Sequence, residues 1–304
     1  MRPYQAEDAD AVARLWNTIE AACGVGEGFS GPEIRDRMGV YPERWASHTR
    51  LYFTPDGSLA AAGLVEQPPP GGTKAYADGG VHPDWRGRGL GRSIIAWQLE
   101  RLAELHRDVA PDLPWEAESG CLSNDESALR LLKAAGLVPV RYYFDMFAPS
   151  GSVDAPLPDG LRMVPYTEDR AHQLYHAHME AFADYWGFQE REFDKWTPYT
   201  IGQELFRPDL SRLVFDGDEI VAYVLSYDAP EKKVYVGQVG TRRPWRRRGI
   251  AGAMLADVLT AAADRGYERV QLGADADSPT GAVAVYERVG FRSEATFVMH
   301  RIAV

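Results

Sequence analysis

A duplicated segment constrains the fold of this chain more than any other feature of its sequence. The two copies read VHPDWRGRGLGRSII, which begins at Val81, and TRRPWRRRGIAGAML, which begins at Thr241. At an offset of 160 residues, without a gap, they share a tryptophan, two arginines and a glycine. Apolar side chains follow at helical spacing in both copies, so each segment is predicted to lead into a helix that faces a core.

A second pair of segments, SNDESALRLLKAAGL and DSPTGAVAVYERVGF, repeats at an offset of 154 residues. Each is predicted to be a capped helix. Asn124 with Asp125, and Ser278 with Pro279, are helix-start signals, and a glycine ends each helix. Because two blocks recur in the same order, we interpret the chain as two copies of one domain.

The boundary between the copies is predicted from composition. APSGSVDAPLPDG is rich in Pro, Gly, Ser and Asp and lacks periodicity, which is typical of a linker. We therefore predict a first domain at 1–148, a linker at 149–160 and a second domain at 161–304.

Both halves show the same order of predicted elements, which indicates the α/β class with a mixed α+β sheet. A helix comes first, then a hairpin with an Asp-Gly turn, then a third strand that runs into the Arg/Gly segment. A further strand, the capped helix and a terminal strand complete each half. The predicted ranges are 4–20 and 166–186 for the first helices, 50–67 and 212–228 for the hairpins, 74–81 and 233–240 for the third strands, and 115–119 and 269–274 for the further strands.

The charge of the chain limits its partners. A formal net charge of −11 over 304 residues disfavours nucleic acid and anionic membranes as partners. Two cysteines in so long a chain indicate free thiols in a reducing compartment. The first residues do not resemble a secretion signal and no run of 18 apolar residues occurs, so we expect a cytoplasmic protein. The oligomeric state stays open.

The Arg/Gly segments offer the chemistry of an anion site. The first amides of a helix are unpaired, the helix dipole favours negative charge there, and glycine lets the backbone approach a ligand closely. Arginine adds forked donors for phosphate oxygens. An ordinary strand-to-helix turn with a solvated arginine face is the alternative, and two copies in register favour the site. The chain has no Walker-type motif, and the glycines of the Arg/Gly segments do not have the G-x-G-x-x-G spacing.

Both segments resemble the Q/R-x-x-G-x-G/A motif of the GNAT N-acetyltransferase superfamily. The resemblance covers nearly the whole chain as two tandem domains, and it implies a mostly antiparallel sheet flanked by helices in each. It also implies acetyl-CoA as the cofactor, with its pyrophosphate in the turn. The residues assigned to acetyl-CoA on this basis are Val81, Arg86, Gly87, Arg88, Gly89, Leu90, Gly91 and Arg92 in the first half, and Val239, Thr241, Arg246, Arg247, Arg248, Gly249, Ile250, Ala251, Gly252 and Ser278 in the second.

The two halves differ at one position of the downstream helix. The family pattern N-x-x-A-x-x-x-Y-x-x-x-G-F is met in the second half by Tyr286, with Ser278 in place of Asn, whereas the first half has Leu132. The resemblance implies that Tyr286 protonates the departing thiolate and that a backbone amide near Val239 stabilises the oxyanion. We therefore expect catalysis in the second half. Without the resemblance, a core tyrosine on the apolar face of its helix is the favoured interpretation of Tyr286. Whether the first half binds acetyl-CoA or is structural stays open.

The acceptor site is predicted in the segment FADYWGFQEREFDKWTPY, where Tyr185 and Trp186 are the candidate binding residues. An aromatic and acidic pocket suits a cationic amine. A helix pair with a solvated charged face is the alternative. His178, Asp275 and Asp277 are candidates for the general base, and none is favoured. No metal site is predicted, since H-Q-L-Y-H lacks the glutamate of a zinc-protease helix.

The predicted function is transfer of an acetyl group from acetyl-CoA to a primary amine of a small molecule. Two alternatives stay open. One is an acyl-CoA-binding pseudoenzyme that acts as a sensor or scaffold without turnover, and the other is an aminoacyl- or peptidyl-type acyltransferase with a larger donor.

Overall fold

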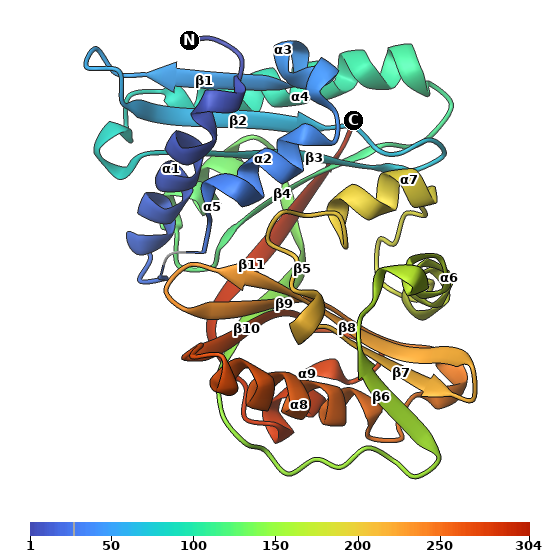
Figure 1. Cartoon of the computed structure of the whole chain (residues 1–304). Coiled ribbons are helices and arrows are strands. Elements are labelled where there is room, and N and C mark those ends of the chain that lie inside the picture. The colour runs from blue at the N-terminus through green and yellow to red at the C-terminus, as the bar shows by residue number, and fades with distance from the viewer. Residues whose placement is uncertain (27) are drawn as a thin grey trace. The chain divides into compact units, whose positions relative to one another are not determined.

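The computed structural model describes residues 1–26 and 28–304, and Figure 1 shows its helices and strands. Its contacts divide the chain into two compact units. Unit 1 comprises Met1–Tyr142 and Ala295–Val304, and unit 2 comprises Tyr143–Glu294. Each unit has its own strands, helices and apolar cores. Within the described residues, no helix is both long and apolar enough to cross a bilayer.

The sheet of unit 1 has the strand order β1-β2-β3-β4-β11. Its strands are β1 (Thr49–Phe53), β2 (Leu59–Glu66), β3 (Lys74–Val81), β4 (Glu116–Leu122) and the later part of β11 (Arg292–Ala303). β3 and β4 run parallel, whereas the other neighbours run antiparallel. The predicted hairpin and third strand of the first half are thereby confirmed.

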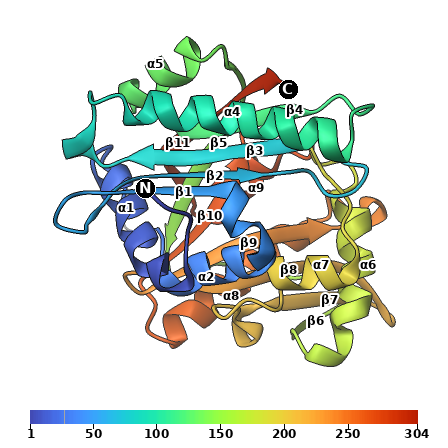
Figure 2. The ribbon, with the colours of Figure 1, turned by 90° about the horizontal axis from the view of Figure 1, so that it is seen from above.

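Helices lie against both faces of the unit 1 sheet. They are α1 (Ala9–Ala21), α2 (Gly31–Gly39), α3 (Trp45–His48), α4 (Leu90–Val109) and α5 (Glu126–Ala134). One core joins α4 and α5 to β2, β3 and β4, and includes Trp97 and Leu102. A second core joins α1 and α2 to β1 and β2, and includes Leu15 and Ile34. Figure 2 shows α4 running alongside β3, away from α1 and α2.

The sheet of unit 2 has the strand order β5-β10-β9-β8-β7-β6. The strands are β5 (Val138–Pro149), β6 (Leu161–Pro165), β7 (Arg212–Asp216), β8 (Glu219–Ala229), β9 (Lys233–Thr241) and β10 (Arg269–Asp275). β9 and β10 run parallel, and the other neighbours run antiparallel. The predicted α/β class with mostly antiparallel sheets is therefore confirmed.

The helices of unit 2 also belong to two cores. They are α6 (Ala171–Phe182), α7 (Phe193–Trp196), α8 (Ile250–Asp264) and α9 (Ala282–Arg288). α8 and α9 pack with β5, β8, β9 and β10 in a core that contains Met254 and Tyr286. α6 and α7 pack with β7 and β8 in a core that contains Leu174, Trp196 and Tyr223. Side chains alternate along β8, so β8 contributes residues to both cores, one on each face of the sheet.

The last strand of each sequence half pairs in the unit that the other half supplies. β5 ends the first half, yet its residues 143–149 pair with β10 of unit 2. β11 ends the chain, and its residues 297–303 pair with β4 of unit 1. The compact units therefore differ from the predicted bounds at 1–148 and 161–304. Each half presents the same kind of sheet edge. The sequence pattern therefore predicts that β5 and β11 are strands, but it does not specify which strand each one pairs with.

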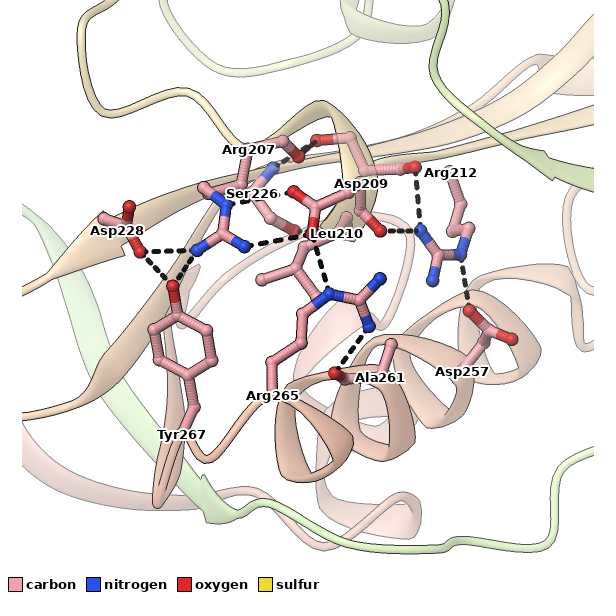
Figure 3. Close-up of polar contacts among 11 residues, drawn as sticks. Arg207, Asp209, Leu210, Arg212, Ser226, Asp228, Asp257, Ala261, Arg265 and Tyr267 are labelled. Carbon is pink, nitrogen blue, oxygen red and sulfur yellow. Dashed lines mark hydrogen bonds and ion pairs between the residues drawn. The ribbon is translucent and has the colours of Figure 1, made fainter.

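A cluster of ion pairs ties the end of α8 to β8 in unit 2 (Figure 3). Its charged members and one phenol are Arg207, Asp209, Arg212, Asp228, Asp257, Arg265 and Tyr267. Arg207 donates to Asp209 and to Asp228 at 2.9 Å each. Every carboxylate of this cluster thus faces a guanidinium group, as expected for charges that hold elements together.

Candidate functional site

Each Arg/Gly segment forms the same turn between a strand and a helix. A short 3-10 helix follows the strand, η3 (Pro83–Trp85) in unit 1 and η7 (Arg243–Trp245) in unit 2. The long helix then begins after Gly89 or Gly249, and both glycines have a φ of 85°. Glycine adopts this left-handed backbone without a steric penalty, which explains why both copies retain it.

One residue of the unit 2 turn is held in an unfavourable backbone conformation. Arg247 has a φ of 61°, and Gly87 occupies the same position in unit 1 with a φ of 77°. A side chain in this region costs about 1–2 kcal/mol. Backbone strain of this kind is common where a loop binds a ligand, and the surrounding structure must hold the loop in place.

The first backbone amides of α4 and α8 lie outside the helical hydrogen-bond ladder. The first intrahelical bond of α4 runs from Ser93 N to Gly89 O at 3.0 Å, and the equivalent bond of α8 measures 3.1 Å. The three amides before each of these donors therefore have no acceptor in the helix. The helix dipole adds partial positive charge at this end, so each turn can bind phosphate oxygens.

Arg86 and Arg246 brace the turns. Arg86 Nη2 lies 2.9 Å from Asp125 Oδ2 at the start of α5. Arg246 Nη1 lies 2.8 Å from Asp184 Oδ2, and its Nε donates to Thr241 O at 3.0 Å. The resemblance assigns both arginines to phosphate, but in the structure their guanidinium groups are bound to carboxylates of the same unit.

The remaining arginines of the turns are more exposed. Arg92, Arg247 and Arg248 are exposed beside the unpaired amides. Arg88 is exposed as well and stacks over the Trp85 ring, 4.3 Å from its centroid. These four exposed guanidinium groups, unlike the two that brace the turns, stay candidates for phosphate binding.

β9 and β10 separate along part of their length. Their parallel pairing ends at Val236 and Leu272, although β9 continues to Thr241 and β10 to Asp275. At the same point the pairing of β9 with β8 shifts by one residue, which marks a β-bulge at Gly237. A gap between the two strands follows from these observations, and we call it the β9–β10 gap.

Backbone amides of β9 face the β9–β10 gap. Arg242 N donates to Val221 O of β8 at 2.9 Å. Because successive residues of a strand present their amides to opposite sides, Val239 and Thr241 present theirs away from β8. The amide of Val239, which the resemblance implies as the oxyanion donor, and that of Thr241 therefore point toward the β9–β10 gap.

Tyr286 lies on the buried face of α9. Its side chain is 8% exposed, and its ring centroid lies 6.3 Å from that of Phe291. Burial, with a smaller contribution from the phenol of Tyr185, raises the pKa of Tyr286 to about 12. The hydroxyl is thus protonated at neutral pH, as a general acid must be. Leu132 of α5 is buried in the core of unit 1.

The start of α9 differs from its prediction. The helix begins at Ala282 after Gly281, which has a φ of 70°, and not at Ser278 with Pro279. Ser278 lies in the preceding turn, and its hydroxyl is 2.9 Å from that of Thr280. Ser278 therefore belongs to a turn before the helix, which the sequence pattern did not distinguish from a helix start. The start of α5 is as predicted, since Asp125 accepts a hydrogen bond from Ala128 N at 3.0 Å.

The predicted acceptor segment follows α6 and reaches the unit 2 turn. Tyr185 is 41% exposed and Trp186 is half-buried. The electrostatic effect of Tyr185 on Tyr286 indicates that the two phenols lie near each other. Asp184 is bound by Arg243 and Arg246, and these hydrogen bonds hold its pKa below the usual value. Tyr185 and Tyr286 therefore lie in the same region of unit 2.

His178 is a buried member of the same region. Its Nδ1 lies 2.6 Å from the Tyr223 hydroxyl, and its ring stacks on Phe182 at 4.6 Å. Burial lowers the pKa of His178 to about 4, so the imidazole is neutral at pH 7. A Cβ at Gly240 would clash with the Tyr223 ring. The pair thus supports β9 beside Val239, a role that the sequence did not reveal.

The parallel pairing of β3 with β4 in unit 1 also ends early, at Tyr76 and Glu118, but the neighbouring pair of strands in unit 1 has no bulge. β2 and β3 pair without a shift from Ala61↔Val81 to Glu66↔Tyr76. A Cβ at Gly80 would clash with Ile19 and Trp16 of α1, so these side chains fill that face. Asp78, at the position of Gln238, forms an ion pair with Arg37 of α2.

Comparisons with known proteins agree with this geometry. A model of the Acetyltransferase (GNAT) family matches residues 171–291. The mycothiol acetyltransferase of Clavibacter michiganensis subsp. michiganensis is 30% identical over 99% of this chain and 98% of that protein. The structure of a GCN5-related N-acetyltransferase from Sphaerobacter thermophilus has a TM-score of 0.81 and 30% identity, and the match covers 99% of this chain and 94% of that one.

A third comparison concerns the fold alone. A tandem GNAT protein from the clavulanic acid biosynthesis pathway has a TM-score of 0.65 at 16% identity, over 99% of this chain and 97% of that one. Two turns with open helix starts, a strand gap and a full-length relative at 30% identity lead to one conclusion. The chain belongs to the GNAT acetyltransferase family, and it is an acetyl-CoA-dependent N-acetyltransferase.

Proposed function

We propose that unit 2 transfers the acetyl group of acetyl-CoA to the primary amine of a small molecule, and that unit 1 does not carry out this chemistry. The proposal rests on one difference between the units: their turns are alike, but the helix beside each turn carries a different residue at one position. α9 places the Tyr286 phenol in the core next to the turn of unit 2, where α5 of unit 1 has Leu132. A leucine side chain has no proton to give.

The residues of unit 2 fit acetyl-CoA in three ways. The amides at the start of α8 and the exposed Arg247 and Arg248 suit its phosphates. The Val239 amide suits the oxygen of its acetyl group. Bound acetyl-CoA supplies a thioester as the acetyl donor, and the Tyr286 hydroxyl holds the proton that the leaving thiolate requires.

For unit 1 we propose acetyl-CoA binding without turnover. Its turn has the same glycine conformation and the same open amides as that of unit 2. The ion pair of Arg37 with Asp78 lies on the face on which an acceptor would approach, where unit 2 has the uncharged Gln238. Mass spectrometry of the purified chain under native conditions counts bound CoA, and two molecules per chain support this proposal. One molecule at saturation contradicts it.

A small molecule is the acceptor class supported by the relatives. The names of these relatives suggest the de-acetylated precursor of mycothiol as the first amine to test. We choose glucosamine and putrescine as two further amines. We place the reaction in the cytoplasm because the two cysteines of the chain are free thiols. The net charge of −11 supports a small-molecule partner in preference to a nucleic acid.

The proposed function is tested by the release of free CoA thiol from acetyl-CoA in the presence of each amine. We expect at least one of the three amines to raise the release rate more than tenfold and to appear as its N-acetyl product. Tight acetyl-CoA binding with no stimulation by any amine would instead favour a binding protein without turnover.

A further inference from the structure

Asp145 is a half-buried carboxylate that the sequence analysis did not single out. It lies on β5, where it pairs in register with Gly273 of β10. Its neighbours Met146 and Ala148 belong to the core under α8. Because side chains alternate along a strand, the neighbouring Asp145 points to the opposite face of the unit 2 sheet.

Free space adjoins Asp145 at the β9–β10 gap. Gly273 is the first residue of β10 beyond the last pair with β9, Leu272↔Val236. Leu272 and Ala274 face the core, so the open side of Gly273 is the face of Asp145. A Cβ built at Gly273 would have no atom within 4 Å. A ligand group therefore has room over Gly273, one strand away from Asp145.

The charges around Asp145 favour a cation in this space. Its two carboxylate oxygens accept hydrogen bonds from Gln271 Nε2, at 2.9 and 3.0 Å. Lys233 and Arg269 act on Asp145 electrostatically, and each pairs with another carboxylate, that of Glu231 or Glu294. Three carboxylates against two cations leave one negative charge.

Asp145 thus differs from the carboxylates of the Figure 3 cluster. Asp209, Asp228 and Asp257 each contact a guanidinium group. Asp145 has the neutral amide of Gln271 as its hydrogen-bond partner among the described residues. Burial, with a smaller opposing effect of Gln271, raises the pKa of Asp145 to about 6. Such a carboxyl is ionised at neutral pH and is still basic enough to accept a proton.

Gln238 supplies a second polar group across the gap. It follows the bulge on β9, and it lies on the same face as Gly240, which contacts the Tyr223 ring. Its Oε1 is buried and has no hydrogen-bond partner among the residues that the structure describes. Buried acceptors without a donor are rare in folded proteins, and an N–H group of a ligand would satisfy this one.

We propose that Asp145 binds the ammonium group of the acceptor over Gly273 and takes the proton that the amine must lose before attack. This inference rests on the proposed function of unit 2. The ammonium gives one proton to the Asp145 carboxylate, and the freed lone pair forms a bond to the acetyl carbon. The bond from this carbon to the CoA sulfur breaks, and the thiolate takes a proton from Tyr286. The nitrogen then gives its second proton to the Tyr286 phenolate, which restores the hydroxyl. The first proton leaves Asp145 for solvent, so each turnover releases one proton.

The test uses Asp145→Asn in the full chain, with whichever of the three amines stimulates the unaltered protein most. Asparagine retains the size of the side chain and an acceptor for Gln271. We expect kcat/KM for the amine to fall about 100-fold, while Kd for acetyl-CoA stays within twofold. In the unaltered protein kcat/KM rises with pH through about 6, as Asp145 ionises. The variant lacks this rise.

Two further variants and one binding measurement complete the experiment. Asp145→Glu retains a carboxylate and is expected to recover at least a tenth of the kcat/KM that Asp145→Asn loses. Asp257→Asn removes a carboxylate that is paired with Arg212 and is expected to retain the pH profile. Calorimetric titration of the amine into protein saturated with CoA shows whether binding itself depends on Asp145. We expect binding by the unaltered protein and none by Asp145→Asn.

The outcomes separate this inference from the proposed function. If no amine stimulates the unaltered protein, the proposed function fails and the role of Asp145 fails with it. If the unaltered protein is active and Asp145→Asn retains its kcat/KM, its pH profile and its amine binding, the role of Asp145 alone is refuted. Loss of amine binding and of the pH profile in Asp145→Asn, with partial recovery in Asp145→Glu, supports the role.

Discussion

The two units carry the same strand-to-helix turn beside different sheets. In both, a glycine with a φ of 85° starts the long helix and leaves its first amides open. In unit 1, β3 and β4 separate as β9 and β10 do, but β2 and β3 pair without a bulge and α1 covers Gly80. In unit 2 a bulge interrupts the pairing and a polar group, Gln238, lies at the gap. An anion site is thus a local feature of one turn, whereas the acetyl-transfer site also requires parts that lie far apart in the sequence.

Replacing the helix-start glycines is the most drastic way to compare the turns. Gly249→Val places a β-branched side chain at a φ of 85°, where L-residues are strained by at least about 1–2 kcal/mol. We expect kcat/KM for acetyl-CoA to fall on the order of 100-fold, as measured by thiol release. The matched variant Gly89→Val in unit 1 is expected to leave the rate within twofold and to remove one bound CoA. Equal losses in the two variants would contradict the assignment of chemistry to unit 2.

The buried histidine of unit 2 predicts a dependence of stability on pH. The pKa of His178 is about 4 in the folded chain, against 6.5 for an unperturbed histidine. Below pH 6.5 the unfolded chain therefore binds more protons than the folded chain, and the free energy of unfolding falls as the pH is lowered. At about 1.4 kcal/mol per pH unit, the loss between pH 6.5 and 5 is about 2 kcal/mol.

Urea denaturation of the unaltered chain and of His178→Phe at both pH values measures this effect. We expect the variant to lose about 2 kcal/mol less than the unaltered chain over this range. An equal loss in both proteins would show that His178 is not buried in the neutral form. This prediction concerns stability and not catalysis, because His178 forms its hydrogen bond with Tyr223 in the core.

The exposed arginines give a smaller expected effect. Arg248→Ala removes one guanidinium group beside the open amides of α8, and a hydrogen bond to a charged group contributes about 1.5–3 kcal/mol. We expect KM for acetyl-CoA to rise about tenfold with little change in kcat. Arg88→Ala in unit 1 is expected to leave both constants unchanged. A change in kcat without a change in KM for Arg248→Ala would point to a role other than phosphate binding.

The ion pair on the filled face of unit 1 has the smallest expected effect. Arg37 and Asp78 are each about one-third exposed, so solvent screens their attraction and the pair stabilises the chain by less than about 1 kcal/mol. We expect Arg37→Ala to lower the free energy of unfolding by no more than this and to leave thiol release unchanged. A fall in rate of more than about fivefold would give unit 1 a part in the chemistry.

Much of the fold could be predicted because its signals are local. The offset between the two Arg/Gly segments predicted the duplication, and the glycine before each long helix predicted the open helix start. Asp125 predicted the start of α5. In each case the residue determines the conformation of its own backbone, so the pattern alone is sufficient.

The remaining features depend on contacts between distant segments. Arg86 and Arg246 have the composition of phosphate ligands, but carboxylates elsewhere in the same unit bind them. Gly237 becomes a bulge only because β8 and β9 pair out of step around it. Asp145 was overlooked because β5 pairs with β10 in unit 2, which no residue of β5 specifies. An aspartate within the otherwise apolar run of YYFDMFA was the available signal.

The central claim is that acetyl transfer belongs to unit 2 and needs the phenol of Tyr286. Tyr286→Phe and Leu132→Phe change the same helix position in the two units, and both place a phenylalanine ring in a core. The measurement is kcat for amine-stimulated thiol release at saturating acetyl-CoA. The account predicts a loss of at least about 100-fold for Tyr286→Phe and less than twofold for Leu132→Phe. An unchanged kcat in Tyr286→Phe would contradict it.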